Sequence, residues 1–341
     1  MQAYRITAGQ GIGSLQRVAL TPREPGPFEV RVRIKAVSLN FRDLMVARGD
    51  YHYQKAGGAS VIPASDAAGE VVAVGAEVTR YRPGDRVMGA FLPDWVDGEP
   101  NLVNTARAPG AGDDGVLASE VVFSEHSLVA IPDALSDEQA ATLPCAAVTA
   151  WNALFVAGRA RAGQTVLLLG TGGVSIWGLQ LAKAAGLRAI ITSSSNDKLA
   201  RARELGADDL VNYRDHPEWQ DEVLRVTGGE GAHVVLEVGG EGTLERSIAA
   251  VRHGGAVGII GGVSGFASVP VSPLALIAGN KRLEGIFVGS RKMLEDVTRL
   301  VDRARIAPVI DRVYGFDEAP AAFERLASGR HFGKVVIRVD A

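Results

Sequence analysis

The order of apolar and polar positions divides the chain into two parts. Up to about residue 125, short apolar segments alternate with polar residues in a period of two, most clearly over 30–37 and 70–74. This period is typical of half-buried strands. A turn at 82–85 precedes a further expected strand at 86–89. The pattern predicts a β-rich first domain.

From about residue 127, continuous apolar runs alternate with helical patterns. Continuous apolar strands separated by helices are typical of a parallel sheet that is covered on both faces. We therefore expect a doubly wound parallel sheet, which places the protein in the α/β class. The expected strands are 165–169, 189–192, 209–213, 233–238, 256–260 and 283–288, and the expected helices are 174–185, 196–206, 217–227, 242–252 and 272–279.

The C-terminal segment returns to a mixed pattern, with expected helices at 291–305 and 317–328 and a last strand at 334–339. We expect these elements to complete the first domain. The predicted division is a discontinuous domain of 1–125 and 294–341, with 126–293 inserted as a dinucleotide-binding domain. The segment 91–115 is rich in Pro, Gly, Asp and Asn and is predicted to be a long surface loop over the substrate site.

Composition narrows the class of protein. The 341 residues include 36 Lys and Arg against 39 Asp and Glu, a net charge of −3, so we expect no binding to nucleic acid or to a membrane surface. The single cysteine, Cys145, excludes a disulfide framework and a multi-cysteine metal site. The N-terminal residues do not form the apolar segment of a signal peptide. We expect a cytoplasmic enzyme or binding protein that acts on a small molecule.

A glycine-rich turn follows the expected strand 165–169 and precedes an expected helix, which is the setting that a dinucleotide-binding fingerprint requires. Gly170 permits a sharp turn, and Gly172 lets the backbone approach a pyrophosphate at the helix N-terminus. Ser175 replaces the third glycine of the fingerprint. The motif predicts a nicotinamide dinucleotide bound by Gly170, Gly172, Gly173 and Val174.

The end of the second strand of this domain bears on the choice of cofactor. NAD sites normally carry Asp or Glu there to bind the ribose 2′-hydroxyl, and residues 188–195 contain neither. Hydroxyls and one cation are available instead for a 2′-phosphate, with an aromatic side chain after the third strand. Alternatively, the cation is an ordinary solvated charge. We predict NADPH in preference to NADH, bound by Ser193, Ser194, Ser195, Lys198 and Tyr213.

Several motifs occur in the order found in one superfamily: SLNFRD (38–43), AAGEVVAVG (67–75), RPGDRV (82–87), LPCAAVTAW (143–151), the glycine turn, GADDLVNYR (206–214) and GKVVI (333–337). The chain resembles the medium-chain dehydrogenase/reductase superfamily, and within it the zinc-free quinone oxidoreductase and enoyl reductase branch. The resemblance implies a GroES-like catalytic domain, a Rossmann domain and an active site between them. It also implies a homodimer joined at Rossmann sheet edges, for which 256–260 is a candidate edge.

Alcohol dehydrogenases of this superfamily hold a catalytic zinc with Cys, a His-Glu pair and a further Cys or Asp. In this chain the first position is Asn40, and Ser65 and Asp66 replace the His-Glu pair; only Cys145 remains where the third ligand falls. One thiolate without its partners does not build the open three-ligand site of zinc catalysis. We expect no zinc.

Without a Lewis acid, hydride transfer to a quinone or an α,β-unsaturated carbonyl is the less demanding reaction, because hydrogen-bond donors can stabilise the developing charge. The resemblance places Asn40 at the nicotinamide and substrate. Asp43 either orients this loop or takes part in catalysis. Tyr51 lies where related enoyl-thioester reductases carry a proton-donating tyrosine, or else lines a loop. Arg42 either anchors an anionic substrate or is a solvated charge.

The resemblance also implies further cofactor contacts, from Thr149, Gly262, Val263, Val288, Gly289 and Lys334. The leading interpretation is a zinc-independent, NADPH-dependent oxidoreductase acting on a quinone or an α,β-unsaturated carbonyl. An alcohol dehydrogenase and a non-catalytic nucleotide-binding protein remain as alternatives, because a fold does not by itself define a function.

Overall fold

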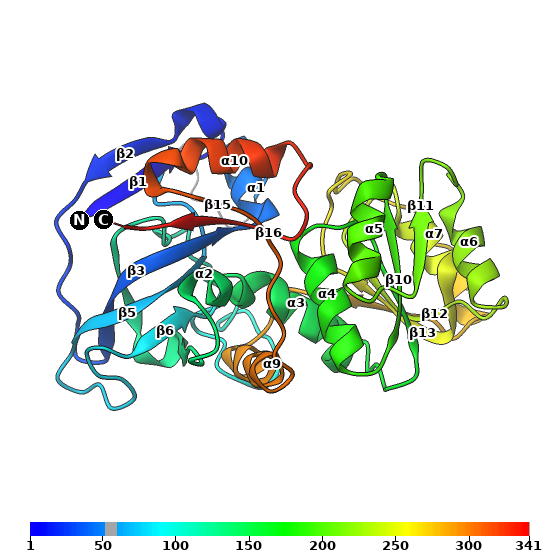
Figure 1. Ribbon diagram of the computed structural model, residues 1–341, viewed down its shortest axis with the longest axis horizontal. Coiled ribbons are helices and arrows are strands. Elements are labelled where there is room, and N and C mark those ends of the chain that lie inside the picture. The colour runs from blue at the N-terminus through cyan, green and yellow to red at the C-terminus, as the bar shows by residue number, and fades with distance from the viewer. Residues whose placement is uncertain (52–59, 341) are drawn as a thin grey trace. The chain divides into compact units, whose positions relative to one another are not determined.

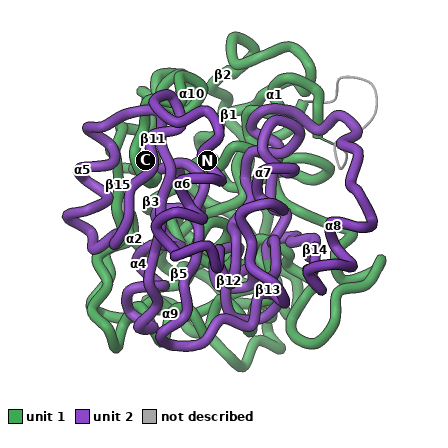
Figure 2. The backbone as a smooth tube through the Cα atoms, turned by 90° about the vertical axis from the view of Figure 1, so that its right-hand side faces the viewer, with its two compact units in different colours: residues 1–148, 289–341 green, residues 149–288 purple. Residues whose placement is uncertain are grey.

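The computed structural model describes residues 1–51 and 60–340. The chain forms two compact units (Figures 1 and 2). Unit 1 contains Met1–Val148 and Gly289–Ala341, and unit 2 contains Thr149–Val288.

Unit 1 is built on a seven-stranded sheet with β3 (Glu29–Leu39) near its centre. The order is β15-β16-β3-β5-β6-β8, with β7 also paired to β3; all pairs are antiparallel except β15 with β16. A smaller antiparallel sheet has the order β2-β1-β4. The other strands are β1 (Gln2–Thr7), β2 (Gln16–Ala19), β4 (Ser60–Val61), β5 (Asp66–Val74), β6 (Arg86–Gly89), β7 (Glu120–Ser124), β8 (Leu128–Ala130), β15 (Ile310–Tyr314) and β16 (Lys334–Arg338).

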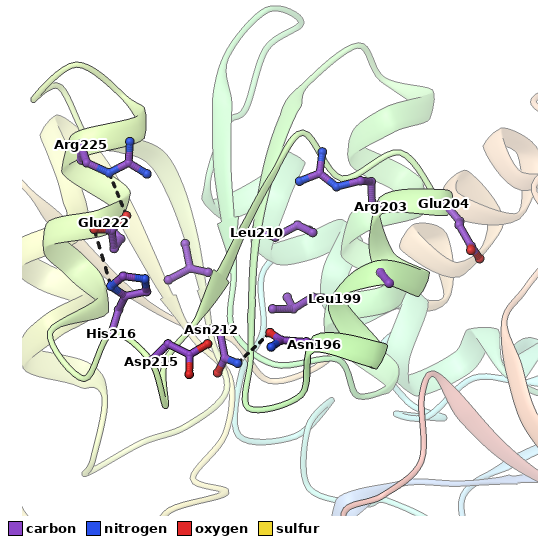
Figure 3. A pocket seen from close by; sticks show the side chains of 12 residues that line it. Asn196, Leu199, Arg203, Glu204, Leu210, Asn212, Asp215, His216, Glu222 and Arg225 are labelled. Carbon is purple, nitrogen blue, oxygen red and sulfur yellow. Dashed lines mark hydrogen bonds and ion pairs between the residues drawn. The ribbon is translucent and has the colours of Figure 1, made fainter.

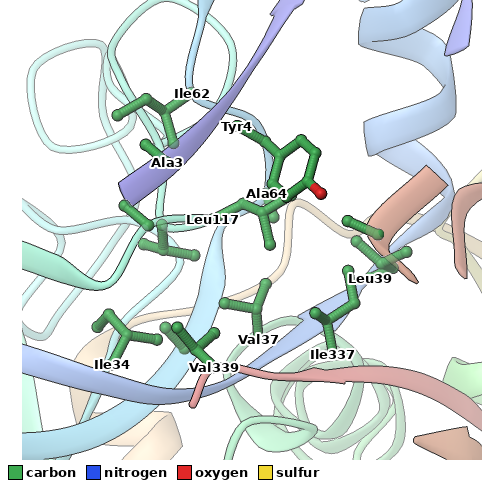
Figure 4. Close-up of a cluster of buried hydrophobic side chains, with 14 of the residues drawn as sticks. Ala3, Tyr4, Ile34, Val37, Leu39, Ile62, Ala64, Leu117, Ile337 and Val339 are labelled. Atoms are coloured by element: carbon green, nitrogen blue, oxygen red, sulfur yellow. The ribbon is translucent and has the colours of Figure 1, made fainter. Parts of the chain in front are cut away.

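The hydrophobic core of unit 1 joins segments from both ends of the chain. Figure 4 shows Val37 and Leu39 of β3 together with Ile337 of β16 and Leu117, all of which are buried. Alternation along β3 directs every second side chain into this core, as the period-two pattern predicts. The helices of this unit are α1 (Phe41–Arg48), α2 (Asp137–Ala140), α9 (Arg291–Arg303) and α10 (Ala319–Ala327).

The domain limits expected from the sequence differ from the limits of the units. Residues 126–148 were expected in the inserted domain, but β8 pairs with β6 and α2 contacts β3 and β5 of unit 1. Residues 289–293 also belong to unit 1, because α9 contacts β8 there. A short strand such as β8 carries too weak a pattern to show from sequence which sheet it joins.

Unit 2 contains a six-stranded, fully parallel sheet in the order β11-β10-β9-β12-β13-β14, which confirms the doubly wound α/β fold. The strands are β9 (Thr165–Leu168), β10 (Arg188–Ser193), β11 (Asp209–Asn212), β12 (Ala232–Glu237), β13 (Val251–Ile259) and β14 (Arg282–Gly285). The helices are α3 (Val148–Trp151), which begins at the last residue of unit 1, α4 (Gly173–Ala184), α5 (Asn196–Glu204), α6 (Trp219–Val226), α7 (Leu244–Ala250) and α8 (Pro273–Ile277).

The expectation that 256–260 forms a sheet edge is wrong. β13 pairs with β12 on one side and with β14 on the other, so it lies inside the sheet. In the described part of unit 2 the two edge strands are β11 and β14. The glycines that flank 256–260 indicated an edge strand. However, β14 pairs with the outer side of β13 and is itself the outermost strand, which the local sequence of 256–260 cannot show.

The segment 91–115 is partly buried, and a helical run that follows it is strongly apolar. The segment 91–115 is anchored by buried residues, among them Phe91, Leu92 and Trp95, whereas Leu102 and Val103 are 93% and 80% exposed. Among the described residues, one helical run, Asp137–Ala157, has the length and apolar character of a membrane span, and 72% of its most apolar window is buried inside the protein.

Candidate active site

Asn40 and Lys334 meet because β3 and β16 are neighbours. Val335 pairs with Leu39, which places the first residue of β16 beside the end of β3. The Lys334 Nζ atom donates to the Leu39 carbonyl at 2.6 Å and to Asn40 Oδ1 at 2.5 Å. Both side chains are buried, with Lys334 3% and Asn40 7% exposed. The ammonium group therefore fixes the side chain that the sequence analysis placed at the substrate.

Asp66 lies at the start of β5, where it pairs with Ser38 of β3. Its Oδ1 accepts a hydrogen bond from Ser65 Oγ at 2.7 Å, and its Oδ2 accepts one from the Cys145 backbone N–H at 2.9 Å. Burial raises the pKa of this carboxyl group, while the Lys334 charge and the nearby Asn40 amide oppose that rise. Asn40, Asp66 and Cys145 thus converge in space, and Lys334 lies among them.

Arg42 and Asp43 follow Asn40 in the first turn of α1. Asp43 Oδ2 accepts a hydrogen bond from the Asn40 backbone N–H at 2.8 Å and so caps the helix. Burial raises the pKa of Asp43 to about 6, against the effect of the Arg42 charge. The Arg42 and Asp43 side chains approach to 3.9 Å. The capping bond gives Asp43 a structural role, and a catalytic role stays a prediction.

The alternative that Arg42 is a solvated charge is wrong. The residue is 7% exposed, and its Nη1 donates to the Pro109 carbonyl. The guanidinium carbon lies 4.7 Å from the ring centroid of Tyr51 and 5.2 Å from that of Phe91. Such cation–π contacts stabilise a desolvated cation by about 2 kcal/mol. Tyr51 is half-buried and packs against the core of unit 1, and its role as proton donor stays a prediction.

The donor set at these positions does not fit a zinc ion. Both oxygens of Asp66 accept other hydrogen bonds, and Asn40 Oδ1 accepts from an ammonium group that would repel a divalent cation. Desolvation raises the pKa of the Cys145 thiol. In the parts of the chain that the structure describes, no group of three or more His, Cys, Asp or Glu side chains is arranged to hold a metal.

The glycine turn of unit 2 is fixed by hydrogen bonds to β10 and to the first turn of α4. Gly170 has a φ of +74°, which favours glycine, and its N–H donates to Thr192 Oγ1 of β10 at 3.1 Å. Ser175, which replaces the third fingerprint glycine, donates to the Leu169 carbonyl at 2.6 Å. Helix α4 begins at Gly173 with Gly172 as its N-cap, and Val174 lies in its first turn. This is the strand–turn–helix geometry that a pyrophosphate site requires.

The predicted adenosine-end residues come together because β10 and β11 are parallel neighbours. The Tyr213 N–H donates to the Ser193 carbonyl at 3.1 Å. Ser193 Oγ accepts from the Ser195 N–H, and Ser195 Oγ accepts from the Lys198 N–H as the N-cap of α5. Two of the three hydroxyls therefore already order the backbone. The Ser194 and Lys198 side chains are half-buried, and Tyr213 is 41% exposed.

A surface groove of about 660 Å³ lies outside these residues, along β11 between α5 and α6 (Figure 3). Asn196 and Asn212 hydrogen-bond at 2.8 Å on one side of it, and Glu222 pairs with Arg225 at 2.8 Å on the other. Its lining mixes acidic and basic side chains and includes none of the predicted site residues.

The remaining predicted cofactor residues lie at strand ends and near the unit boundary. Val263 follows β13, and its N–H donates to the Val238 carbonyl at 3.1 Å; Gly262 precedes it and is buried. Thr149 is buried in α3. In Gly289 an added Cβ would lie 2.7 Å from Val148 Cγ1 and 2.6 Å from Met293 Sδ, so a larger residue would clash.

Val288 has a φ of +50°, a left-handed conformation that is strained for a β-branched residue. Its carbonyl accepts a hydrogen bond from the buried Asn152 Nδ2 at 2.9 Å, which holds this conformation. Asn152 was not predicted from the sequence. It follows α3 and Val288 follows β14, and no local pattern shows that these distant segments are in contact.

Glu237 is a second residue that the sequence analysis missed. It ends β12 and is fully buried. Its carboxylate accepts hydrogen bonds from the N–H groups of Gly239 at 2.6 Å and Gly240 at 3.0 Å, from Thr243 Oγ1 at 2.6 Å, and from Ser247 Oγ. Its signal in the sequence was an acid at a strand end, separated by one valine from two glycines. The carboxylate fixes the loop that follows β12.

A glycine turn of dinucleotide-binding geometry in unit 2 and a GroES-like β-domain with a buried polar cluster in unit 1 are typical of oxidoreductases of the nicotinamide-dependent dehydrogenase class. Two family models match the chain: the alcohol dehydrogenase GroES-like domain over residues 26–133 and the zinc-binding dehydrogenase over residues 173–303. The chain belongs to the medium-chain dehydrogenase/reductase superfamily, as its motifs indicated.

Individual relatives differ in the activity that their names give. A zinc-type alcohol dehydrogenase-like protein of Schizosaccharomyces pombe is 42% identical over 326 residues, which cover 94% of this chain and 93% of the relative. A quinone oxidoreductase of Pseudomonas aeruginosa is 32% identical and covers 93% of both chains. Among solved structures, an NAD-dependent alcohol dehydrogenase has a TM-score of 0.89 at 34% identity, covering 99% of this chain and all of that one. A quinone oxidoreductase of Pseudomonas syringae has a TM-score of 0.83 at 28% identity and covers 99% of both chains.

Proposed function

We propose that the protein is a zinc-independent oxidoreductase that transfers hydride to a quinone or to an α,β-unsaturated carbonyl compound. The observation that carries this proposal is the Lys334 ammonium group bonded to Asn40, among residues at the positions where related alcohol dehydrogenases hold zinc. A cation is already present there, and the surrounding donors do not fit a metal.

The bound nicotinamide supplies the hydride in this reaction. Negative charge then develops on the conjugated oxygen of the substrate, where hydrogen-bond donors lower the barrier. Asn40 is the donor that we assign to this oxygen, and Tyr51 is the residue that we assign to donate the proton. Arg42 lies over the Tyr51 ring, with 4.7 Å between the guanidinium carbon and the ring centroid, and so holds this side chain by a cation–π contact.

We propose NADPH as the cofactor. Ser194 and Tyr213 follow the carboxyl ends of the neighbouring parallel strands β10 and β11, and Lys198 lies in the first turn of α5. The end of β10 carries no acid to bind a ribose 2′-hydroxyl. A hydroxyl, an ammonium group and an aromatic face suit a 2′-phosphate. One solved relative is named NAD-dependent, so NADH is the alternative that binding measurements must compare.

The second candidate function is alcohol oxidation, favoured by relatives whose names say alcohol dehydrogenase. Without a metal to stabilise the alkoxide, this chain would need another group to remove the alcohol proton. The buried cluster offers Asp43 and Asp66, both of which already accept hydrogen bonds. That arrangement favours carbonyl-type acceptors over unactivated alcohols.

We also propose a homodimer of a cytoplasmic protein. The strand β14 has one side without a partner strand in the described part of unit 2, and Leu274 and Ile277 of the neighbouring α8 are 70% and 75% exposed. An unpaired edge beside apolar side chains is typical of a strand-pairing interface. A small-molecule substrate is the other partner that we propose. The single cysteine, which cannot form a disulfide within the chain, is consistent with the reducing environment of the cytoplasm.

The deciding experiment follows nicotinamide absorbance with chelator-treated protein, a benzoquinone, a simple enone, an enoyl thioester and a primary alcohol, each with both cofactors. We expect NADPH-dependent turnover of a quinone or enone that survives chelation. Alcohol turnover that requires added zinc would overturn the proposal. Cofactor binding without turnover of any acceptor in the panel would instead favour a non-catalytic nucleotide-binding protein.

A further inference from the structure

We infer that Lys334 is a positioning residue: its ammonium group orients the Asn40 side chain so that Asn40 presents its amide N–H, and not its carbonyl, to the substrate oxygen. Asp66 balances the charge of Lys334. This inference rests on the proposed function for its substrate, but its structural basis is the contact between Lys334 and Asn40.

The chemistry of the contact determines which way the amide points. A lysine ammonium group has three N–H donors and no acceptor, so it can contact an asparagine side chain only through the amide oxygen. Lys334 Nζ is held in place by its second bond, to the Leu39 carbonyl. Because Oδ1 faces Lys334, Nδ2 occupies the other end of the planar amide group and points away from Lys334.

Asn40 Nδ2 is buried and lies near enough to Asp66 for the amide to lower the pKa of that carboxyl group, but it makes no hydrogen bond of normal geometry with the described residues. A buried donor without a partner costs about 1–3 kcal/mol. The Asp66 carboxylate has its two well-aligned hydrogen bonds with Ser65 Oγ and the Cys145 N–H. The lack of a well-aligned partner for Nδ2 is the second observation that indicates a ligand here, and an oxygen of a bound carbonyl compound would supply that partner.

The Lys334 charge also makes Asn40 a better donor. A cation on the amide oxygen withdraws electron density from the amide nitrogen, and successive hydrogen bonds polarise one another in a buried site. When hydride adds to the conjugated carbon, the π electron pair moves to the substrate oxygen, and the Asn40 N–H then contacts a developing anion. A proton from Tyr51 or water completes the reduction.

The buried charges around this contact balance. Lys334 and Arg42 are cationic, and Asp66 and Asp43 are anionic; all four residues are at least nine-tenths buried. The Lys334 charge lowers the pKa of both carboxyl groups against their desolvation. Removing Lys334 alone therefore leaves an uncompensated buried carboxylate, which can unfold the protein.

The test compares Asn40→Asp, Asn40→Ala, Lys334→Met and the pair Asn40→Ala/Lys334→Met with the wild type. Asn40→Asp keeps an oxygen for Lys334 but removes the N–H donor, so we expect kcat to fall about 100-fold, as for loss of one oxyanion donor. If Lys334 acts through Asn40, the double variant loses no more kcat than Asn40→Ala does. Additive losses, or full activity in Asn40→Asp, would overturn the inference.

Cofactor affinity separates this role from direct cofactor binding. We expect Lys334→Met to leave the Kd of NADPH, measured by nicotinamide fluorescence, within about twofold of the wild type while kcat falls; a large rise in Kd would show that Lys334 instead binds the cofactor. Lys334→Met/Asp66→Asn removes both charges and keeps the test available if the single variant does not fold. Lys292→Met, which removes a half-exposed ion pair with Asp296 in the same unit, is the matched control.

A readout independent of turnover distinguishes failure of the inference from failure of the proposed function. In protein labelled with ¹⁵N-lysine, we expect one slowly exchanging ammonium signal that is absent in Lys334→Met, shifts in Asn40→Ala and is unchanged in Lys292→Met. If the wild type reduces no acceptor but shows this signal, the proposed function fails and the contact stands. If the chemical shift of this signal is unchanged in Asn40→Ala, the inference fails whether or not the protein is active.

Discussion

Lys334 and Asn40 are separated by 294 positions in the chain, and yet their side chains form a hydrogen bond of 2.5 Å. Lys334 was expected to contact the cofactor, and Asn40 was expected to lie at the nicotinamide and the substrate. Their contact joins both residues in one buried polar cluster with Asp66, because antiparallel pairing of β16 with β3 brings the two strand ends together. The expected cofactor role of Lys334 and the positioning role inferred here make different predictions for NADPH affinity.

Arg42→Leu should destabilise the protein by about 1–3 kcal/mol, because the Pro109 carbonyl loses its donor and Asp43 loses its neighbouring cation. Urea unfolding measures this change. Arg82→Leu is the control, since its pair with Asp85 is largely exposed and should contribute less than about 1 kcal/mol. Equal effects of the two substitutions would contradict the buried position of Arg42.

The contribution of Asp43 to stability should depend on pH. Its pKa in the folded protein is about 6, above the ordinary value of 3.8, so the folded state binds this proton more tightly than the unfolded chain does. The free energy of unfolding of the wild type relative to Asp43→Asn should therefore rise as the pH falls through 6, by at most about 1.4 kcal/mol per pH unit, and level off near pH 4. Denaturation of both proteins between pH 7 and 4 measures this difference, and a flat difference would contradict the raised pKa.

Ser194→Asp should reverse the cofactor preference. An acid at the end of β10 repels a 2′-phosphate and can accept a hydrogen bond from a ribose 2′-hydroxyl. We expect the Kd of NADPH to rise at least about 10-fold and that of NADH to stay constant or fall, as measured by fluorescence titration. Ser328→Asp adds the same charge in unit 1 and should leave the ratio of the two constants unchanged. An unchanged ratio in Ser194→Asp would place the 2′-position elsewhere.

Glu237→Gln should destabilise unit 2 by about 2 kcal/mol or more, because an amide cannot accept the hydrogen bonds that four donors make to the carboxylate. Thermal unfolding measures this loss. We also expect weaker NADPH binding, because the loop after β12 contacts residues 263–265, next to the predicted cofactor residues. Glu230→Gln, which removes an exposed pair with Arg252, should have little effect on either quantity.

Replacing Leu274 and Ile277 by Glu should convert the proposed homodimer into a monomer, since charges on α8 would have to be buried beside β14 in the interface. Analytical ultracentrifugation of the wild type and the double variant measures this. Val103→Glu, at another exposed apolar position, is the control and should not change the mass. A wild type that sediments as a monomer would contradict the dimer directly.

The sequence by itself determined the elements whose pattern is strong and local. The alternating strand over 30–37, the apolar strands of unit 2 and the glycine turn at Gly170 all form where they were expected, because side-chain period and glycine spacing act within a few residues. Weak or very short strands, such as β4 and β8, escaped prediction for the same reason.

Only the tertiary structure decided which of these residues act together. Local sequence gives no sign that Lys334 bonds to Asn40, that Asp66 holds the Cys145 backbone, or that Asn152 supports the strained Val288. It also could not show that β14 and not 256–260 lies at the sheet edge, or that Arg42 is buried in contact with two aromatic rings. These relations depend on strand order and on the burial of charge, which arise when distant segments pack against each other and the polar groups left inside must find partners.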